Sequence, residues 1–200
     1  MNSVILTKTY SKMPFCEKEI LRYAGCKEAD SAISSAIKDC INEVAEKITF
    51  KVCYCELPFK TDGKLCDFEV FKAQSENLAK NLSGCKRVIL FAATVGIEID
   101  RLITKYGRLS PHKALIIQAI GAEQIEALCD RFLEDVKKEY ACELKPRFSP
   151  GYGDLSILAQ KDIFNLLEPE RKIGLTLNSS QLMSPTKSVT AFVGLCDFSE

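Results

Sequence analysis

Apolar residues recur at steps of three and four along much of the chain, and this spacing is typical of amphipathic helices. In the first half it predicts a helix over Glu28–Ile48, preceded by a shorter helix over Glu17–Tyr23 that Gly25 closes. A further short helix is predicted over residues 73–82 and ends near Gly84.

The longest helical pattern lies in the second half. A helix is predicted over residues 99–106, and Ser110–Pro111 then provides an N-cap followed by proline at the first helical position. The helix that begins there extends to about Tyr140, and Gly121 and Ala122 at its middle let another backbone or a ligand approach closely. The apolar stripe of this helix comprises Leu115, Ile117, Ile120, Ile125, Leu128, Phe132 and Val136.

Two patterns in the first half predict strands. Apolar and polar residues alternate over residues 48–55, and an Asp-Gly turn signal at Asp62–Gly63 then predicts a β-hairpin over residues 48–70. Val88–Ala93 is a continuous apolar run, which is typical of a central strand buried on both faces.

Downstream of the long helix, Ser156–Leu167 is predicted as another amphipathic helix. Ile173–Leu177 and Val189–Leu195 alternate and predict two strands, joined by Asn178–Lys187. The order of elements lacks a regular βαβ rhythm. The predicted fold class is therefore α+β, with a mixed or antiparallel sheet flanked by helices.

The length fits one domain or two small ones, and the composition argues against nucleic-acid or membrane partners. The 200 residues are 46% hydrophobic, and the 27 basic and 27 acidic side chains give a net charge of zero. A nucleic-acid surface needs a basic excess, and a membrane span needs about 18 consecutive apolar residues, which this chain lacks. The N-terminal residues have no signal-peptide architecture, so we expect a cytoplasmic protein.

The ten cysteines contain no CxxC pair. We expect them to serve as small apolar residues in a reducing cytosol. An alternative starts from Cys53 and Cys55, which share one face of a predicted strand, with Cys66 across a turn. These three thiolates would hold a metal or a redox centre, although the only histidine, His112, lies at a helix start and offers no fourth ligand.

No catalytic constellation is visible. With one histidine the chain has no Ser-His or Cys-His pair and no histidine metal site, and the phosphate-binding glycine fingerprints are missing. We therefore predict no catalytic residue. Any chemistry would proceed by binding and positioning a ligand.

The stretch RFSPGYGD, residues 147–154, is the first candidate ligand site. Arg147 offers a planar fork of donors for a carboxylate, and Tyr152 offers a ring face for an adenine or a sulfonium cation. Ser149 and Gly151 keep the loop narrow, so its backbone can reach a ligand. The alternative is a Pro-Gly turn with an arginine on its rim.

Two further segments are candidates. Glu126 lies one residue off the apolar stripe of the long helix, where it can receive an ammonium group or ribose hydroxyls; the alternative is a solvated glutamate. Met183–Ser188 connects the last two predicted strands and is either a polar hairpin loop or a surface that meets a partner.

Together these motifs resemble the activation (reactivation) domain of cobalamin-dependent methionine synthase, in a stand-alone bacterial form. The resemblance covers residues 110–195 best, and upstream Phe91–Gly96 is also similar. The motifs that carry it are Arg-x-x-x-Gly-Tyr at 147–152, Leu166–Glu168, Ile173–Asn178, Met183-x-Pro185 and Ser188–Thr190. The resemblance implies an activation-domain fold over residues 1–200, with a helix and hairpin portion at 1–85 and a ligand-binding portion at 86–200.

The family binds S-adenosylmethionine and docks on a cobalamin domain. When the cofactor is oxidised to cob(II)alamin, a donor such as flavodoxin reduces it, and the methyl group of S-adenosylmethionine traps the reduced form. Carried over to this chain, Arg147 would hold the ligand carboxylate, Ser149 and Gly151 would give backbone contacts, and Tyr152 would pack on the ligand. Glu126 would match the acidic residue of the family's long helix.

This chain departs from the family pattern at three points. Gly153 stands where the family has proline, and the tryptophan-containing acidic segment is missing because the chain has no tryptophan. The sequence also stops at Glu200, before a tail that supplies a late tyrosine in the full enzyme.

The resemblance predicts an S-adenosylmethionine-binding reactivation protein that supports reductive methylation of cob(II)alamin on a separate corrinoid protein or methionine synthase module. In methionine biosynthesis it would be an accessory part of a methyltransferase, since 200 residues leave no space for the other modules. The alternatives are a ligand-free docking or scaffold module for a corrinoid protein, and the cysteine-thiolate metal or redox protein.

Overall fold

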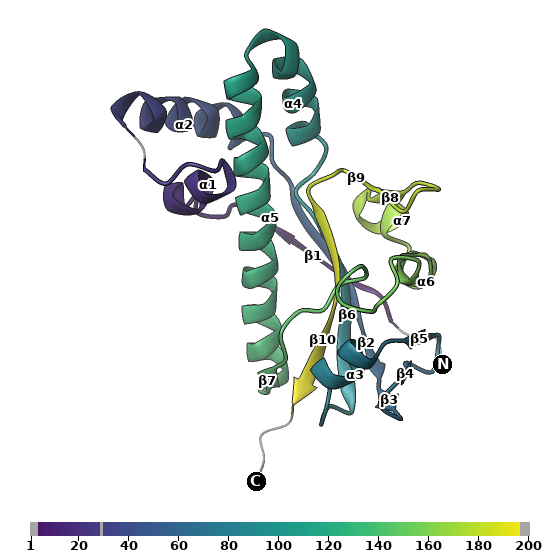
Figure 1. Cartoon of the computed structure of the whole chain (residues 1–200). Coiled ribbons are helices and arrows are strands. Elements are labelled where there is room, and N and C mark those ends of the chain that lie inside the picture. Colours follow the sequence, from purple (N-terminus) through teal and green to yellow (C-terminus); the bar gives the residue numbers. More distant parts are fainter. Residues whose placement is uncertain (1–3, 29, 197–200) are drawn as a thin grey trace.

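A five-stranded antiparallel sheet forms the centre of the molecule (Figure 1). The computed structural model describes residues 4–28 and 30–196, so the predicted helix over Glu28–Ile48 and the predicted unit over 1–200 include residues outside the described ones. The strands lie in the order β1 (Leu6–Tyr10), β2 (Phe50–Pro58), β6 (Arg87–Thr94), β10 (Ser188–Cys196) and β7 (Glu143–Leu144).

The middle strand is β6, as its continuous apolar run predicts. Its residues from Val88 to Ala93 are completely buried. It pairs with β2 on one side and β10 on the other, with Ala92 opposite both Cys53 and Thr190. The α+β fold class is therefore confirmed, and every pair of strands in this sheet is antiparallel.

Helices cover both faces of the sheet, and each face has its own hydrophobic core (Figure 1). On one face, α5 runs along the sheet and the helices α1, α2 and α4 pack against it. Their bounds are α1 (Glu17–Tyr23), α2 (Ser31–Val44), α4 (Glu98–Leu109) and α5 (Pro111–Tyr140). The other face carries α3 (Glu76–Asn81), α6 (Ala159–Leu167) and α7 (Pro169–Ile173).

The predicted helices exist, and α2, α3 and α6 are shorter than predicted whereas α4 is longer. Asp30 caps α2 by accepting a hydrogen bond from the Ile33 amide at 2.8 Å, so the helix begins after it. The long helix α5 begins at Pro111 and ends at Tyr140 as predicted. Its apolar stripe is buried except for Leu115, which is 52% exposed. No helix among residues 4–28 and 30–196 is long and apolar enough to cross a membrane.

The predicted hairpin over residues 48–70 is wrong in its pairing. The Asp62–Gly63 turn is present, but it joins two short strands, β3 (Lys60–Thr61) and β4 (Leu65–Asp67), in a small sheet completed by β5 (Lys72–Gln74). Both edges of β2 are already taken, by β1 and β6.

The predicted strand over Ile173–Leu177 is also wrong. Pro169 opens the short helix α7, which runs through Ile173, and Gly174 ends it in the left-handed conformation at φ 75°. What remains is the strand β8 (Thr176–Leu177), which pairs with β9 (Met183–Ser184). The last predicted strand is confirmed as β10, but it belongs to the main sheet and does not pair with β8.

Candidate functional site

The loop 147–154 is held against the edge of β10. Phe148 and Phe192 exchange backbone hydrogen bonds of 3.0 and 2.9 Å, which fix the start of the loop on the sheet. Beyond it, the Gly151 amide donates to the Leu155 carbonyl at 2.9 Å, and the Leu155 amide donates to the Tyr152 carbonyl at 3.0 Å. The loop is therefore closed by its own backbone, and Gly151 accommodates it with a φ of 91°.

Asp154 ties the far end of this loop to α3. Its carboxylate accepts hydrogen bonds from the Glu76 amide at 2.7 Å, the Asn77 amide at 3.2 Å and the Ser75 hydroxyl. The Ser75 hydroxyl and these amides hold the pKa of Asp154 below its usual range. The ligand loop is thus anchored at both ends.

Gly153 explains one departure from the family pattern. Its φ is 54°, and a side chain there would collide with Asn77. Proline is locked near φ −65° and cannot adopt this backbone. In this chain the positive φ of the observed turn therefore favours glycine and excludes proline.

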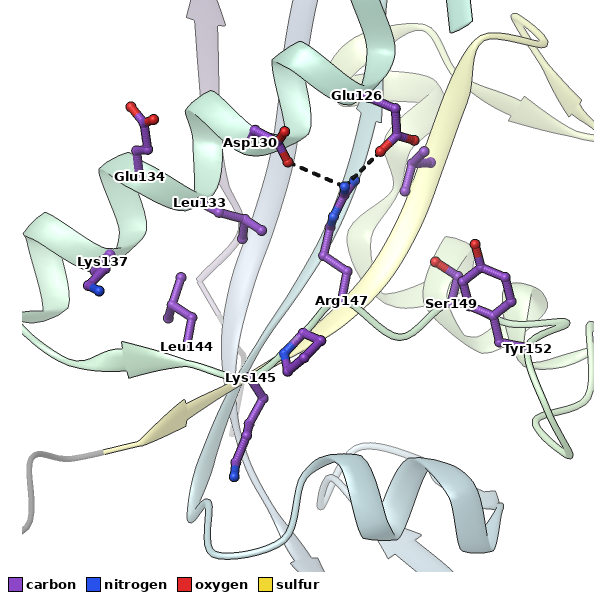
Figure 2. A pocket seen from close by; sticks show the side chains of 12 residues that line it. Glu126, Asp130, Leu133, Glu134, Lys137, Leu144, Lys145, Arg147, Ser149 and Tyr152 are labelled. Atoms are coloured by element: carbon purple, nitrogen blue, oxygen red, sulfur yellow. Dashed lines mark hydrogen bonds and ion pairs between the residues drawn. The ribbon is translucent and has the colours of Figure 1, made fainter. Parts of the chain in front are cut away.

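Arg147 meets two carboxylates of α5 (Figure 2). Its Nη2 lies 2.7 Å from Glu126 Oε2 and 3.3 Å from Asp130 Oδ1. Burial alone would lower the pKa of Arg147, but Cys129 and the two carboxylates raise it, so the guanidinium stays charged. Burial also raises the pKa of Asp130. The structure therefore brings two separately predicted site residues, Arg147 and Glu126, into direct contact.

An open cleft of about 830 Å³ surrounds this ion pair, and we call it the Arg147 cleft. Its volume lies within the range of small-molecule sites. Three predicted site residues besides Arg147 line it, namely Glu126, Ser149 and Tyr152, whereas Gly151 does not. Its other lining residues are Asp130, Leu133, Glu134, Lys137, Leu144, Lys145, Pro146 and Val189.

A second hollow of about 300 Å³ adjoins the cleft, and we call it the Gln160 hollow. It shares Ser149, Tyr152 and Val189 with the Arg147 cleft. Tyr152 lines both cavities and therefore lies at the boundary between the cleft and the hollow. Its side chain is 62% exposed. The remaining lining residues are Pro150, Gly151, Gln160, Met183, Ser188 and Thr190.

The segment 183–188, predicted as a polar loop or a contact surface, is tied down. The Thr186 amide donates to Asp100 of α4 at 2.8 Å, and the Ser188 hydroxyl donates to Thr94 of β6 at 2.8 Å. Met183 and Ser188 line the Gln160 hollow. This segment is therefore a wall of the site and not a free loop.

Asp130 is a site residue that the sequence reasoning missed. It lies four residues after Glu126 on the same face of α5, and this spacing is the signal that predicts a shared position. Asp130 and Glu126 also line a hollow of about 400 Å³ beside α1. Phe15, Cys16 and Glu19 line the same hollow. The segment before α1 thus approaches the site, although the family's acidic segment is missing from the sequence.

The alternative thiolate site has no support. Burial raises the pKa of Cys53 and of Cys55 to about 12 and that of Cys66 to about 11, so all three are neutral thiols at neutral pH. Across residues 4–28 and 30–196, no group of three His, Cys, Asp or Glu side chains is arranged to hold a metal. The buried cysteines pack as small apolar side chains, as expected.

The structure is an α+β domain with an antiparallel sheet and an open, loop-bounded cleft beside its long helix. Residues 67–197 match the family described as vitamin B12 dependent methionine synthase, activation domain. This match spans more than half of the chain, and the chain therefore belongs to that family. The resemblance in the sequence is confirmed.

A solved structure supports the same fold. The chain is similar, with a TM-score of 0.73 and 17% identity, to the structure titled "Crystal Structure of the MetH Reactivation Domain bound to AdoHcy". The alignment covers 98% of this chain and 80% of that one. No curated protein matches the chain. At this identity the structural likeness establishes the fold.

Proposed function

We propose that this domain binds S-adenosylmethionine in the Arg147 cleft and supports the reductive methylation of a corrinoid carried by a methionine synthase module or another corrinoid protein. A flavodoxin-type donor would supply the electron. The observation that carries the proposal is the contact of Arg147 with Glu126 and Asp130 at a ligand-sized cleft. Family membership and the AdoHcy named for the similar structure support it.

The charges of the cleft suit the amino-acid end of this ligand. Both carboxylate contacts of Arg147 run through Nη2, so the N–H groups of Nε and Nη1 remain for charge-assisted hydrogen bonds to the ligand carboxylate. Glu126 and Asp130 place negative charge beside it for the ligand ammonium. The cation of Arg147 thus complements the carboxylate of a zwitterionic amino acid, and the two carboxylates complement its ammonium group.

The rest of the loop positions the ligand. Ser149 and Gly151 present backbone groups, and the exposed ring of Tyr152 offers a π face to the adenine or the sulfonium of the ligand. When bound, S-adenosylmethionine supplies an electrophilic methyl group to the partner's reduced corrinoid. This transfer needs alignment and no general base, in keeping with the absence of any predicted catalytic residue.

The surface beside the loop suits a docking partner. Tyr152, Leu158 and Leu182 are each more than half exposed, at 62%, 57% and 65%. Exposed apolar side chains next to a ligand site are a feature of interaction surfaces. We expect the corrinoid-bearing partner to cover this side, so that the ligand lies between the two proteins.

A second candidate function is a docking module that binds no ligand. One observation favours it, because Arg147 already has two carboxylate partners within the domain. An arginine satisfied in this way can serve to fix the loop on α5. Under this alternative, the domain would bind a corrinoid protein without S-adenosylmethionine.

Calorimetric titration with S-adenosylmethionine or S-adenosylhomocysteine separates the two. We expect wild-type binding, and a loss of affinity of at least about tenfold in Arg147→Ala, because charge-assisted hydrogen bonds to the ligand carboxylate are removed. Arg101→Ala is the matched control, since Arg101 lies on α4, pairs with Glu98 and lines neither the Arg147 cleft nor the Gln160 hollow. No binding by the wild type, with retained capture of a corrinoid protein, would favour the docking module.

A further inference from the structure

Gln160, in the first turn of α6, is a buried polar side chain whose acceptor is unused. It is 5% exposed, and its Oε1 has no hydrogen-bond partner among the described residues. Buried carbonyl oxygens in native proteins are nearly always hydrogen-bonded, so such an oxygen calls for a partner that is added later. The neighbouring space identifies where that partner would come from.

Gln160 lines the hollow that continues from the Arg147 cleft. The two cavities share Ser149, Tyr152 and Val189, so one elongated ligand can occupy both. A ligand whose charged end lies at Arg147 places its other end in the Gln160 hollow. The walls there are the loop backbone around Gly151, the apolar Met183 and the strand β10.

We propose that the Gln160 hollow holds the purine base of the ligand and that Gln160 recognises the exocyclic amine of adenine. This inference rests on the proposed function, because it assigns the second half of the same ligand. A glutamine amide matches an adenine edge, since Oε1 accepts from the exocyclic amine and Nε2 donates to a ring nitrogen. The terminal torsion of glutamine is broad, so the amide can turn into the hollow without leaving a rotamer well.

Tyr152 completes the base site. Its largely exposed ring lines both cavities, and aromatic side chains stack on bases regardless of base identity. Tyr152 therefore contributes affinity for any base. Gln160 is the specificity-determining residue, because its unpaired amide oxygen accepts from a purine that carries the amine and has no donor to accept from in one that lacks it.

The test compares S-adenosylhomocysteine with its 6-desamino analogue, in which hydrogen replaces the exocyclic amine, by calorimetric titration. We expect the wild type to prefer the amine-bearing ligand by about tenfold or more. Gln160→Met, which keeps the side-chain length, should bind both ligands equally. Gln181→Met is the matched control, because Gln181 also has a buried, unpaired Oε1 but lies in the β8–β9 turn, and it should keep the preference.

Two outcomes overturn the inference while the proposed function stands. They are equal wild-type affinity for both ligands, and an undiminished preference in Gln160→Met. If wild type binds neither ligand, the inference and the proposed function both fail. If circular dichroism finds Gln160→Met unfolded, the wild-type comparison and Gln160→Glu decide, since a carboxylate still accepts from the amine and should keep part of the preference.

Discussion

The backbone conformation of Gly153 determines how the loop 147–154 turns towards α3. It lets the chain turn at φ 54° between Tyr152, which faces the ligand cavities, and Asp154, which caps α3. A single backbone position therefore connects the ligand loop to its anchor. The family's proline is incompatible with this turn, so the loop of this chain is built differently at one residue.

Restoring proline at this position should harm the protein. We expect Gly153→Pro to lower the free energy of unfolding by more than about 1 kcal/mol, because the native φ is closed to proline. It should also weaken ligand binding, since Tyr152 moves with the loop. Urea denaturation and calorimetry measure the two effects.

Gly153→Asn is the matched control, because asparagine tolerates the left-handed region. It should lose less stability than the proline variant. Equal stability of Gly153→Pro and the wild type would contradict the observed turn.

Parts of the site could be predicted from single residues and parts could not. The sequence indicates Arg147 because it is a cation beside a Pro-Gly turn. It indicates Glu126 because it is an acidic residue beside the apolar stripe of α5. It gives no signal for Gln160, because an unpaired buried oxygen is visible only once α6 packs against the loop. Asp130 lies between these cases, since its spacing from Glu126 is in the sequence but its contact with Arg147 is not.

Among the elements, α5 determines most of the architecture. It packs with α1, α2 and α4 and also supplies both carboxylates of the site. Its apolar spacing predicts it well, because helix periodicity is a local property. The length of β8 is predicted less well, because the alternation of apolar residues extends beyond the strand itself. Alternation alone suggested Ile173–Leu177, while Pro169 and Gly174 impose a helix and its end.

Gly121 lets α5 approach its neighbours. A Cβ at this position would lie 2.7 Å from Ile99 Cγ2 and 2.9 Å from Lys187 Cγ. Gly121→Ala gains about 1 kcal/mol of helix propensity but overpacks a buried contact, which costs about 1–3 kcal/mol. We therefore expect net destabilisation of up to about 2 kcal/mol in urea denaturation.

The matched control is Gly107→Ala in α4, where nothing lies within 4 Å of the added Cβ. It should stabilise the protein by about 0.5–1 kcal/mol, because propensity acts there without a clash. Stabilisation of the same size in both variants would contradict the close approach at Gly121.

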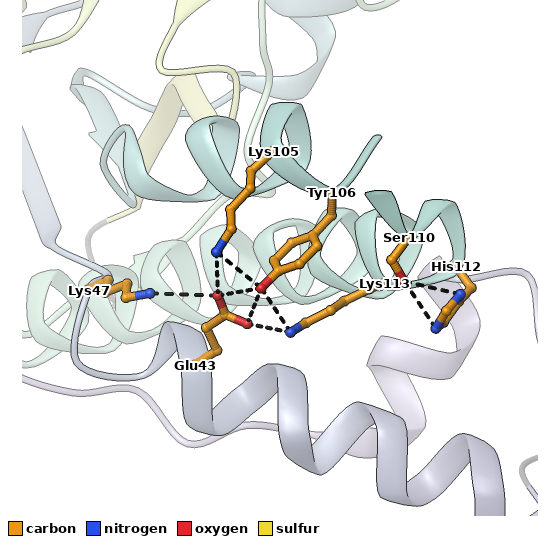
Figure 3. A network of polar contacts seen from close by, with 7 residues as sticks. All are labelled: Glu43, Lys47, Lys105, Tyr106, Ser110, His112 and Lys113. Carbon is orange, nitrogen blue, oxygen red and sulfur yellow. Dashed lines mark hydrogen bonds and ion pairs between the residues drawn. The ribbon is translucent and has the colours of Figure 1, made fainter. Parts of the chain in front are cut away.

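Glu43 joins three helices in one polar network (Figure 3). Its carboxylate lies 2.5 Å from Lys113 Nζ of α5, and the Tyr106 hydroxyl of α4 donates to it at 2.9 Å. The hydrogen bond from Lys113 leads the interactions that hold the pKa of Glu43 below its ordinary value. The carboxylate thus stabilises the fold above about pH 4.3, and this contribution is lost as pH falls through the lowered pKa.

We expect Glu43→Gln to lower the free energy of unfolding by about 1–2 kcal/mol at pH 7, because hydrogen bonds to a charged group are lost. The difference from wild type should shrink as pH falls from about 5 to about 3. Urea denaturation over a pH series measures it.

Glu46→Gln is the control, since Glu46 is solvent-exposed and pairs only at the surface with Lys12. It should change stability by well under 1 kcal/mol. A Glu43→Gln deficit that persists unchanged at low pH would contradict the network.

The whole molecule has two hydrophobic cores on the two faces of the main sheet, and the loop 147–154 lies beside β10 and contacts α5 through Arg147. The cysteines belong to this packing, since seven of the ten are buried. The sequence alone allows a thiolate metal or redox centre as an alternative, because strand alternation places Cys53 and Cys55 on the same face. In the structure Cys53 and Cys55 are buried in the hydrophobic core on one face of the sheet, which suits a role as apolar side chains.

Alkylation reports this packing. In the native protein, iodoacetamide should label the exposed Cys16 first, while Cys53, Cys55 and Cys129 resist, because they are buried and their pKa values are raised to about 12. All ten should label in denaturant. Mass spectrometry of digested samples measures this, and rapid native labelling of Cys53 or Cys55 would contradict the core assignment.

The most direct measurement of the central claim is a crystal structure of the protein with S-adenosylhomocysteine. We predict the ligand carboxylate within hydrogen-bond distance of Arg147, the ammonium beside Glu126 and Asp130, and the base in the Gln160 hollow. A ligand bound at another surface, or an Arg147 cleft without ligand in crystals grown at saturating concentration, would contradict the account.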